Sequence, residues 1–174
     1  MNWMANTVLH WAVVKSPIGD LVLLGSSAGL TRIAWDVSNP SEFAASEADR
    51  GGFTQTSSLP VTSVTAAGQQ LADWFGGRRI EFDVPLSPDP RAKDSFSGRV
   101  LLATSRIPSG QTVTYGEIAR AAGAPSGYRA AGNALGGNPI PIIVPCHRVV
   151  AANGLGGFGG GRERKLLLLA IEQA

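Results

Sequence analysis

The chain has 174 residues, of which 44% are hydrophobic and 16% are charged, and it holds 15 Lys and Arg against 13 Asp and Glu. A chain of this length can bury a core as one domain or as two small ones, so a miniprotein that depends on disulfides or a structural metal is excluded. Its single cysteine cannot close an intramolecular disulfide, and with only two histidines beside it a metal site is not expected.

The charged side chains are unevenly distributed. Residues 1–95 hold 7 basic and 10 acidic side chains, whereas residues 96–174 hold 8 and 3. The basic half is the candidate for contacts with phosphate, and a solvated arginine-rich surface is the alternative. No apolar run approaches the roughly 18 residues that a membrane span needs, and the N-terminal residues lack the pattern of a signal peptide. A cytoplasmic protein without membrane contact is therefore expected.

The N-terminal part predicts a small antiparallel sheet. Strands are expected at residues 8–14, 21–24 and 30–35, because these runs are mostly apolar and are bounded by turns that contain glycine or proline. The polar stretch 38–59 is expected to be a loop with at most one short helix.

A change of pattern marks the end of the first half. Apolar residues at helical spacing predict a helix over 64–74, and residues 80–84 resemble one more strand, so this half is α+β. The segment 87–90 contains two prolines and reads as a linker. We therefore expect two domains, at residues 1–88 and 89–174.

The second half is predicted to be helical and to contain a helix-turn-helix. Apolar residues at helical spacing predict a helix over 96–107, and a Thr-x-x-Glu capping box starts a second one over 114–122. Ser126 can cap a third helix. Two short helices joined by a glycine-containing turn are the outline of a helix-turn-helix. The glycine-rich stretch 154–161, interpreted as a pocket wall or hinge, precedes a last helix from about residue 162 to the end.

Cys146 is the candidate nucleophile. A lone cysteine is usually a small buried hydrophobe, but the neighbours His147 and Arg148 are of the kind that favours the thiolate. Because adjacent residues point in different directions on regular backbone, His147 needs a bent backbone or a bridging water to take the thiol proton. A carboxylate usually orients such a histidine. For Glu172, spacing alone favours a solvent-facing chain end over a buried partner for a cation.

Two further residues stand at helix starts. Tyr115 and Arg129 occupy the first turns of the second and third predicted helices, where free N–H groups can bind a phosphate. The alternatives are a core aromatic for Tyr115 and a surface cation for Arg129.

Taken together, these residues resemble one family, the O6-alkylguanine-DNA alkyltransferases, also called methylated-DNA-protein-cysteine methyltransferases. The most specific match is the box Pro145-Cys146-His147-Arg148 with its flanking isoleucine and valines, residues 143–150. Other matches in the family's order and spacing lie at residues 16–19, 82–86, 114–119, 129–132, 137–140, 160–161 and 164–165. The resemblance therefore covers nearly the whole chain.

The resemblance implies a ribonuclease H-like N-terminal domain and a winged-helix-like C-terminal domain that binds DNA. It implies direct repair by irreversible, stoichiometric transfer of a methyl or other alkyl group from O6-alkylguanine, and from O4-alkylthymine, in double-stranded DNA to the protein. The DNA would be bound in the minor groove with the damaged base flipped out. Neither a cofactor nor an obligatory protein partner is expected, and the DNA-bound protein would be associated with the nucleoid.

The resemblance also implies catalytic roles. Cys146 would be the alkyl acceptor, His147 its base through a water, and Glu172 the group that orients His147. Tyr115 would assist the departure of guanine, and Asn138 would brace the turn beside the site.

Other implied roles concern DNA and the pocket. Arg129 would fill the space left by the flipped base, and the carbonyls of Cys146 and Val149 would accept from the guanine amino group. The further residues implied to contact DNA are Tyr115, Ser126, Gly127, Ala130, Gly132 and Asn133. The residues implied to line the pocket are Val149, Phe158, Gly159 and Gly160.

The chain departs from the family pattern at several positions. Ser97, Leu101 and Ser109 stand where glutamine, tryptophan and an aromatic residue are usual, and Gly159 and Arg162 lie in the variable pocket loop. Two rival functions are a helix-turn-helix module that binds lesions without transfer, as a regulator or an alkyltransferase-like protein, and a thiol hydrolase that turns over. The cysteine argues against an alkyltransferase-like protein, which lacks it.

Overall fold

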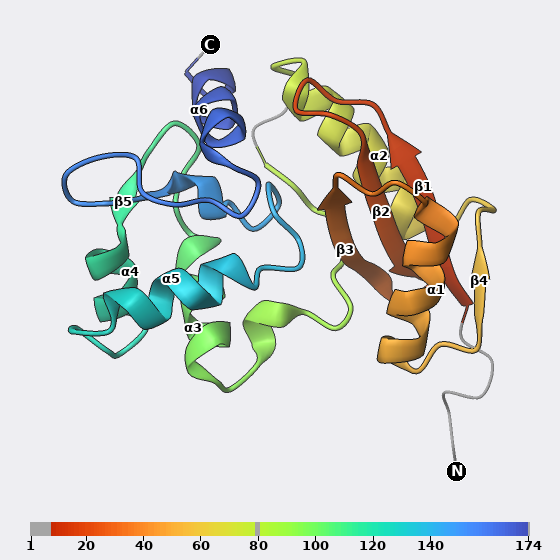
Figure 1. The fold of residues 1–174 in the computed structure, drawn as a ribbon, viewed down its shortest axis with the longest axis horizontal. Coiled ribbons are helices and arrows are strands. Elements are labelled where there is room, and N and C mark those ends of the chain that lie inside the picture. Colours follow the sequence, from red (N-terminus) through yellow and green to blue (C-terminus); the bar gives the residue numbers. More distant parts are fainter. Residues whose placement is uncertain (1–7, 79–80, 174) are drawn as a thin grey trace. The chain divides into compact units, whose positions relative to one another are not determined.

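The computed structural model describes residues 8–78 and 81–173. The chain divides into two compact units, residues 1–88 and 89–174 (Figure 1). Each unit has its own set of helices and strands, so each is described by itself.

The N-terminal unit is built on a four-stranded sheet with the order β3-β2-β1-β4. β1 (Val8–Val14) pairs antiparallel with β2 (Leu21–Ser26), which pairs antiparallel with β3 (Gly29–Trp35). These three strands confirm the antiparallel sheet expected from the runs of apolar residues and the turns between them.

Residues 38–59 are more regular than their polar composition suggests. They form helix α1 (Pro40–Gly51), whose N-cap Asn39 accepts a hydrogen bond from the Glu42 amide, and strand β4 (Gln55–Ser57). β4 pairs parallel with β1, so the sheet is mixed rather than purely antiparallel. The one helix that the prediction allowed is therefore present, but it is longer than expected and a strand follows it. α1 buries only the small side chains Ala44 and Ala48, which leaves little apolar periodicity in the sequence.

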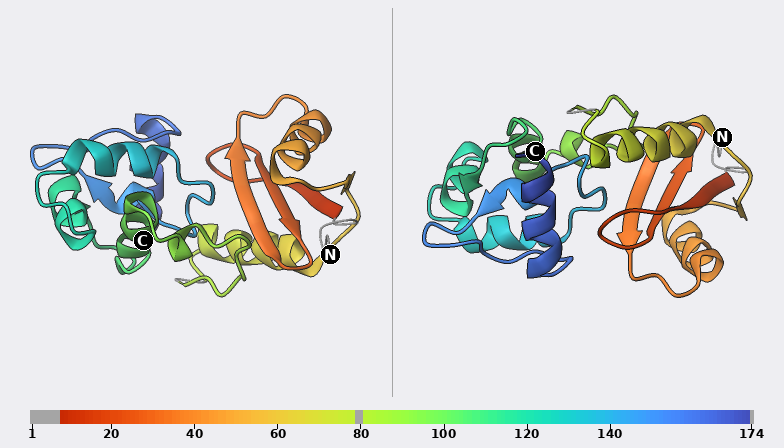
Figure 2. Two further views of the ribbon diagram at one scale, coloured as in Figure 1. Left: turned by 90° about the horizontal axis from the view of Figure 1, so that it is seen from below. Right: turned by 90° about the horizontal axis from the view of Figure 1, so that it is seen from above.

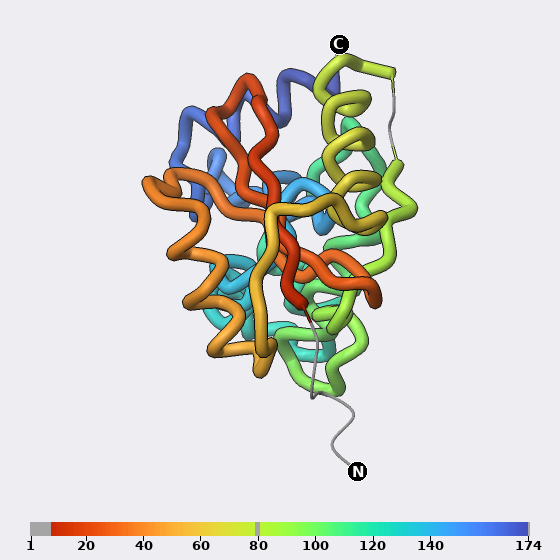
Figure 3. Tube along the Cα trace, turned by 90° about the vertical axis from the view of Figure 1, so that its right-hand side faces the viewer, coloured from red at the N-terminus to blue at the C-terminus, as the bar shows by residue number. Residues whose placement is uncertain are grey.

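Helices cover both faces of the sheet. α1 and α2 (Thr62–Phe75) lie on opposite sides of the strands (Figure 2). The tube view in Figure 3 shows the strands running between these two helices. All six residues of β2 are buried, because successive side chains point to opposite faces of the sheet and a helix covers each face. Val22 and Leu24 pack with the alanines of α1, while the α-carbon of Gly25 faces Ser63 and Val64 of α2.

The strand expected at residues 80–84 is not formed by the described part of that range. Arg79 and Ile80 lie outside the described residues, and residues 81–84 have no strand structure. The chain meets the sheet slightly later, where the Leu30 amide donates to the Pro85 carbonyl at 2.8 Å. Gly29 allows this approach, because a Cβ there would lie 2.7 Å from the Pro85 oxygen.

The C-terminal unit is mostly helical, as expected. Its elements in chain order are η1 (Pro90–Ala92), α3 (Phe96–Thr104), β5 (Val113–Thr114), α4 (Tyr115–Ala121), α5 (Tyr128–Gly136), η2 (Cys146–Arg148), β6 (Val149–Val150) and α6 (Arg162–Ile171). The capping box at the start of α4 is present, with Thr114 and Glu117 each bonding the other's backbone amide. α3 ends three residues before the predicted position. Ser126 does not cap α5, because Gly127 is its N-cap and makes no side-chain bond.

α4 and α5 form the predicted helix-turn-helix (Figure 1). The short parallel pair of β5 and β6 joins the start of α4 to the segment after Cys146, with Val113 opposite Val149. This pairing brings the first turn of α4 close to the cysteine. None of the helices within residues 8–78 and 81–173 combines the length and apolar character required to cross a bilayer.

Candidate functional site

Cys146 opens onto a cavity of about 300 Å³ in the C-terminal unit. The cysteine begins the short helix η2 after Pro145, and its side chain is buried. The cavity is lined by Tyr115, Gly132, Leu135, Gly136, Cys146, Gly157, Phe158 and Gly159. The structure thus brings together residues from α4, α5, η2 and the glycine-rich loop. Of the predicted pocket residues, Phe158 and Gly159 line this cavity, whereas Val149 and Gly160 lie outside its lining.

Behind the cysteine, a buried ion-pair network joins His147 to the C-terminal end of the chain. His147 Nε2 lies 3.1 Å from Glu172 Oε1, and both side chains are at most 1% exposed. The Gly110 amide donates to Glu172 Oε2 at 3.2 Å. Glu172 is therefore a buried partner for cations, and the expectation of a solvent-facing chain end was wrong.

The guanidinium of Arg148 forms an ion pair with the carboxylate of Glu172. Its Nε lies 3.0 Å from each carboxylate oxygen, and its Nη2 lies 2.5 Å from Oε1. Its Nη1 donates to the Ile107 carbonyl at 2.5 Å. The guanidinium thus fixes the carboxylate that faces His147. The position of Arg148 two residues after the cysteine did not reveal this role.

The pKa shifts follow from this burial. Burial raises the pKa of the Cys146 thiol above its ordinary value, although a hydrogen bond with Asn138 and the charge of Lys165 act in the opposite direction. Burial lowers the pKa of His147, against the raising effect of Glu172. Burial raises the pKa of Glu172, but hydrogen bonds from His147 and Arg148 outweigh this and bring it to about 2. At neutral pH the site therefore holds a thiol, a neutral imidazole and a carboxylate.

This protonation state corrects the expectation that the neighbouring cations favour a resting thiolate. The positive charge of Arg148 is directed at Glu172, so it is not aimed at the sulfur. The neutral His147 can instead act as a base and accept the thiol proton when a substrate is present.

Lys165 is a site residue that the sequence reasoning missed. Its side chain is fully buried, and its Nζ donates to the carbonyls of Val149, Leu155 and Gly157 at 2.6, 2.7 and 3.0 Å. Burial lowers its pKa to about 8. Lys165 lies three residues before the buried Leu168 and seven before Glu172, and this helical spacing is the signal that could have placed all three on one inward face.

Tyr115, the first residue of α4, connects the helix-turn-helix to the glycine-rich loop. Its hydroxyl donates to the Gly157 carbonyl at 2.9 Å, and its ring centroid lies 5.7 Å from Lys165 Nζ. Burial, followed by the charge of a Cys146 thiolate, raises the pKa of Tyr115, so the phenol keeps its proton at neutral pH. Gly156 (φ +72°) makes room for the ring, because a Cβ at this position would lie 2.8 Å from it.

Asn138 braces the turn before the cysteine. Its amide nitrogen donates to the Val144 carbonyl at 2.8 Å, and its side-chain oxygen accepts from the Ile140 amide at 3.1 Å. These two bonds close the loop that carries Pro145 and Cys146.

The residues predicted to contact DNA gather on and before α5. Arg129, Ala130 and Asn133 are exposed, as is Ser126 in the preceding turn, while Gly127 and Gly132 are half-buried. The Arg129 guanidinium lies 5.6 Å from the centroid of the Tyr128 ring. Of the positions that depart from the family pattern, Ser97 and Leu101 line a groove between α3 and α5, and Arg162 is exposed at the start of α6.

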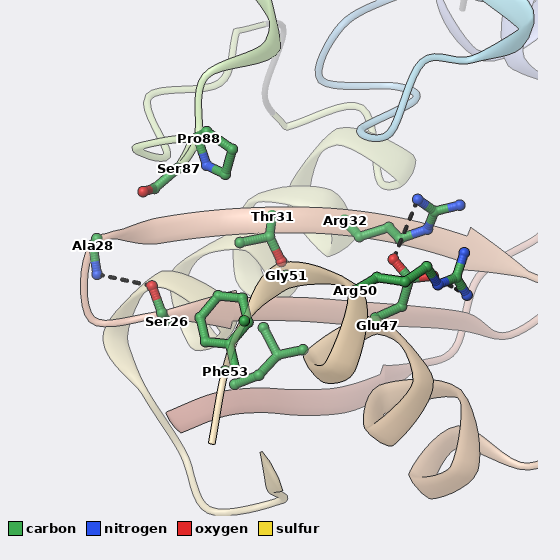
Figure 4. A pocket seen from close by; sticks show the side chains of 12 residues that line it. Ser26, Ala28, Thr31, Arg32, Glu47, Arg50, Gly51, Phe53, Ser87 and Pro88 are labelled. Carbon is green, nitrogen blue, oxygen red and sulfur yellow. Dashed lines mark hydrogen bonds and ion pairs between the residues drawn. The ribbon is translucent and has the colours of Figure 1, made fainter. Parts of the chain in front are cut away.

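The N-terminal unit has a pocket of its own, about 450 Å³ in volume (Figure 4). Glu47 of α1 pairs there with Arg32 of β3 at 3.4 Å and with Arg50 at 2.7 Å. The Phe53 ring packs against Gly51, where a Cβ would lie 2.8 Å from it. The pair with Arg32 ties α1 to the sheet, whereas the pair with Arg50 lies within α1. No cysteine or histidine is among the described residues that line the pocket.

Comparisons with known proteins agree with this arrangement. The ribonuclease-like domain of 6-O-methylguanine DNA methyltransferase matches residues 9–88, and the DNA binding domain of that methyltransferase matches residues 95–174. A relative from Mycolicibacterium paratuberculosis, named methylated-DNA–protein-cysteine methyltransferase, is 42% identical over 169 residues, which are 95% of this chain and 93% of the relative.

Solved structures show the same similarity. The crystal structure of Mycobacterium tuberculosis OGT in complex with DNA has a TM-score of 0.77 at 41% identity and covers 94% of this chain and 92% of its own. The O6-methylguanine-DNA methyltransferase from Pyrococcus kodakaraensis has a TM-score of 0.63 at 25% identity, over 95% of this chain and 99% of its own. With matches across both halves and more than 40% identity over nearly the whole chain, the chain belongs to the 6-O-methylguanine DNA methyltransferase family.

Proposed function

We propose that this protein repairs DNA by moving the alkyl group of O6-alkylguanine, and of O4-alkylthymine, onto Cys146. The observation that carries the proposal is one cavity lined by both a thiol and a phenol, Cys146 and Tyr115, with the buried His147–Glu172 pair behind the thiol. Such a cavity places a soft nucleophile and a proton donor on the same bound base.

The transfer is a displacement at carbon. The sulfur of Cys146 forms a bond to the alkyl carbon as the bond from that carbon to guanine O6 breaks, and the bonding electrons stay with the guanine. His147 takes the thiol proton through a water, and Glu172 stabilises the resulting imidazolium. Tyr115 donates a proton to the departing guanine, and the proton that His147 took is returned to Tyr115 through solvent, so that the products are a thioether and an unmodified base. The electrons balance without a cofactor.

The thioether makes the reaction stoichiometric. Water does not displace a thioether sulfur under ordinary conditions, and the chain has no second cysteine to regenerate the first. Each molecule would therefore accept one alkyl group. The reaction requires a reduced thiol, so we place the protein in the cytoplasm, and on the nucleoid when it is bound to DNA.

Double-stranded DNA is the proposed partner, bound in the minor groove by α5 with the damaged base flipped into the cavity. An enzyme cannot reach a base atom inside the stack, so the base must be extruded at a cost of about a few kcal/mol. Arg129 would stand in the vacated space and offset part of that cost. The small exposed side chain of Ala130 supports a close approach of α5 to the groove floor. This assembly needs no protein partner.

The experiment that tests the proposal is intact-protein mass spectrometry after mixing with an excess of duplex that carries one O6-methylguanine, followed by peptide mapping. We expect a single methyl group on Cys146, with no further adduct as the substrate is increased. The Cys146→Ala variant should bind the lesion but take no methyl group.

Two results would contradict the proposal. If the reduced, folded protein binds the lesion without an adduct, it is a recognition module. If it turns over repeatedly on a small ester, it is a thiol hydrolase.

A further inference from the structure

Helix α5 separates two hollows in the C-terminal unit. Gly132, Leu135 and Gly136 line the Cys146 cavity. The residues of α5 that line a second groove, about 520 Å³ in volume, are Ala130, Asn133 and Ala134, and the C-cap residue Gly137 lines it as well. Each set has the i, i+3, i+4 spacing of one helix face, and the two faces are roughly opposite at 3.6 residues per turn.

The second groove lies between α5 and α3, which are neighbours in the C-terminal unit (Figure 1). Its α3 wall is made by Phe96, Ser97, Gly98 and Leu101, and Lys93 lines it from the segment before α3. Lys93 and Asn133 are exposed. Among the described residues that line the groove, Lys93 is the one with a charged side chain. The groove thus offers an ammonium, a hydroxyl and an amide, all of which can donate hydrogen bonds to a phosphate.

Gly98 sets the position of Lys93. A Cβ on Gly98 would collide with the Lys93 carbonyl oxygen, so the backbone of Lys93 passes directly over this turn of α3. The Ser95 amide donates to the same carbonyl at 2.8 Å, and Ser95 also caps α3 through the Gly98 amide. The neighbouring acidic residue, Asp94, has its carboxylate 3.8 Å from Arg99 Nη1. The backbone of Lys93 is therefore fixed beside the groove, and its exposed side chain starts from this position.

A helix that enters the minor groove has one strand on each side of it. If the strand with the lesion delivers its base to the Cys146 side of α5, the opposite strand passes the α3 side. We propose that the groove between α3 and α5 binds the sugar–phosphate backbone of the strand opposite the lesion, with Lys93 paired to a phosphate and with Ser97 and Asn133 donating hydrogen bonds. This inference rests on the proposed function, because it assumes that α5 enters duplex DNA.

The test compares the Lys93→Gln variant of the full chain with the wild type by fluorescence anisotropy. Binding is measured over a range of salt concentrations, to duplex DNA with one O6-methylguanine and to the lesion strand alone, in a Cys146→Ala background that prevents transfer. We expect Lys93→Gln to weaken duplex binding severalfold and to reduce the slope of log Kd against log salt by about one. Binding to the lesion strand alone should be unchanged. Lys15→Gln, at a 86% exposed lysine of the N-terminal unit, is the matched control.

A second measurement locates the contact. Neutral methylphosphonate linkages are placed one at a time in either strand of the duplex. We expect a methylphosphonate at one position in the opposite strand to weaken binding of the protein that has Lys93. On that duplex the Lys93→Gln substitution should cause no further loss of affinity. The proposal is overturned if Lys93→Gln has no effect, if it weakens duplex and single-strand binding equally, or if the silencing position lies in the lesion strand.

The outcomes separate this inference from the proposed function. A wild-type protein that binds the duplex but accepts no methyl group would overturn the transfer, and the strand assignment could still be read from the methylphosphonates. Normal methylation of Cys146 together with any of the three overturning results would remove the strand assignment alone.

Discussion

Tyr115 and Lys165 donate hydrogen bonds to the same acceptor, the carbonyl of Gly157, at 2.9 and 3.0 Å. The tyrosine comes from the first turn of α4 and the lysine from the first turn of α6, so this carbonyl joins the helix-turn-helix to the glycine-rich loop. In the proposed reaction Tyr115 would turn its hydroxyl toward the bound base, and Lys165 would still donate to the carbonyl. The loop can therefore keep its conformation while the phenol changes partners.

Tyr115→Phe should slow methyl transfer and leave the loop in place. The variant removes the proton donor, but Lys165 still holds the Gly157 carbonyl. We expect a decrease in the single-turnover rate of about tenfold or more, within the range usual for a general acid, with duplex affinity changed by less than twofold. Stopped reactions at fixed times, analysed by mass spectrometry, give the rate. An unchanged rate would show that the hydroxyl does not protonate the leaving base.

Lys165→Met should destabilise the protein as well as slow transfer. The substitution removes the donor to three carbonyls, and a buried acceptor without a partner costs about 1–3 kcal/mol. Urea denaturation measures the loss in the free energy of unfolding. Arg162→Gln, at an exposed residue of the same helix, is the control and should leave both stability and loop structure unchanged.

Glu172→Gln should change how stability depends on pH. The pKa of Glu172 is about 2 in the folded protein, against an ordinary value of 4.5. The unfolded state therefore binds the proton more tightly, so the stabilisation is complete above about pH 4.5 and is lost as the pH falls toward 2. We expect the difference in unfolding free energy between wild type and Glu172→Gln to shrink over this interval. A difference that stays constant from pH 6 to pH 3 would contradict the folded-state pKa.

The same variant should be strongly destabilised at neutral pH. It leaves the Arg148 guanidinium buried without its carboxylate, and removal of one partner of a buried ion pair costs about 3–5 kcal/mol. Thermal and urea denaturation at pH 7 measure this cost. The double variant Arg148→Met, Glu172→Gln should recover part of the stability, since it removes the unpaired charge, but it should not recover the transfer rate.

The thiol of Cys146 should titrate above the ordinary range of a cysteine. Burial raises its pKa, and the charge of Lys165 lowers it. We expect the rate of alkylation by a small haloacetamide to rise with pH through a midpoint above that of free cysteine. Lys165→Met should move the midpoint higher. A midpoint below that of free cysteine would contradict the raised pKa, and a midpoint below neutral pH would mean that the resting protein holds a thiolate.

Arg129→Ala should slow repair of duplex DNA but not the reaction with a free alkylated base. The guanidinium is exposed at the start of α5, and its proposed task is to occupy the vacated position in the stack. We expect the transfer rate to fall by about tenfold or more on duplex DNA and to stay unchanged on the free base, because only the duplex reaction depends on the population of the flipped state. Arg120→Ala, at an exposed arginine of α4, is the matched control. Equal slowing on both substrates would remove this role from Arg129.

Local chemistry explains which elements could be predicted. The capping box at Thr114 and Glu117, the three N-terminal strands and the helix-turn-helix follow from patterns a few residues long. The length of α1 was underestimated because its inward face is made of alanines. β4 was missed because a strand of three residues that pairs parallel with β1 has no local signature. The start of α5 was misjudged at Ser126, since Gly127 ends the preceding turn and the helix begins without a side-chain cap.

The amino-acid sequence by itself determined the family, the helical outline and the candidate nucleophile with its histidine neighbour, because these depend on adjacent residues and on short periodicities. Only the tertiary structure decided the partners and charges of the site. Glu172 binds His147 and Arg148, which precede it in the sequence by 25 and 24 residues. Lys165 donates to the carbonyl of Val149, which precedes it by 16 residues. Burial and long-range pairing set the pKa values, and neither can be read from neighbours in the sequence.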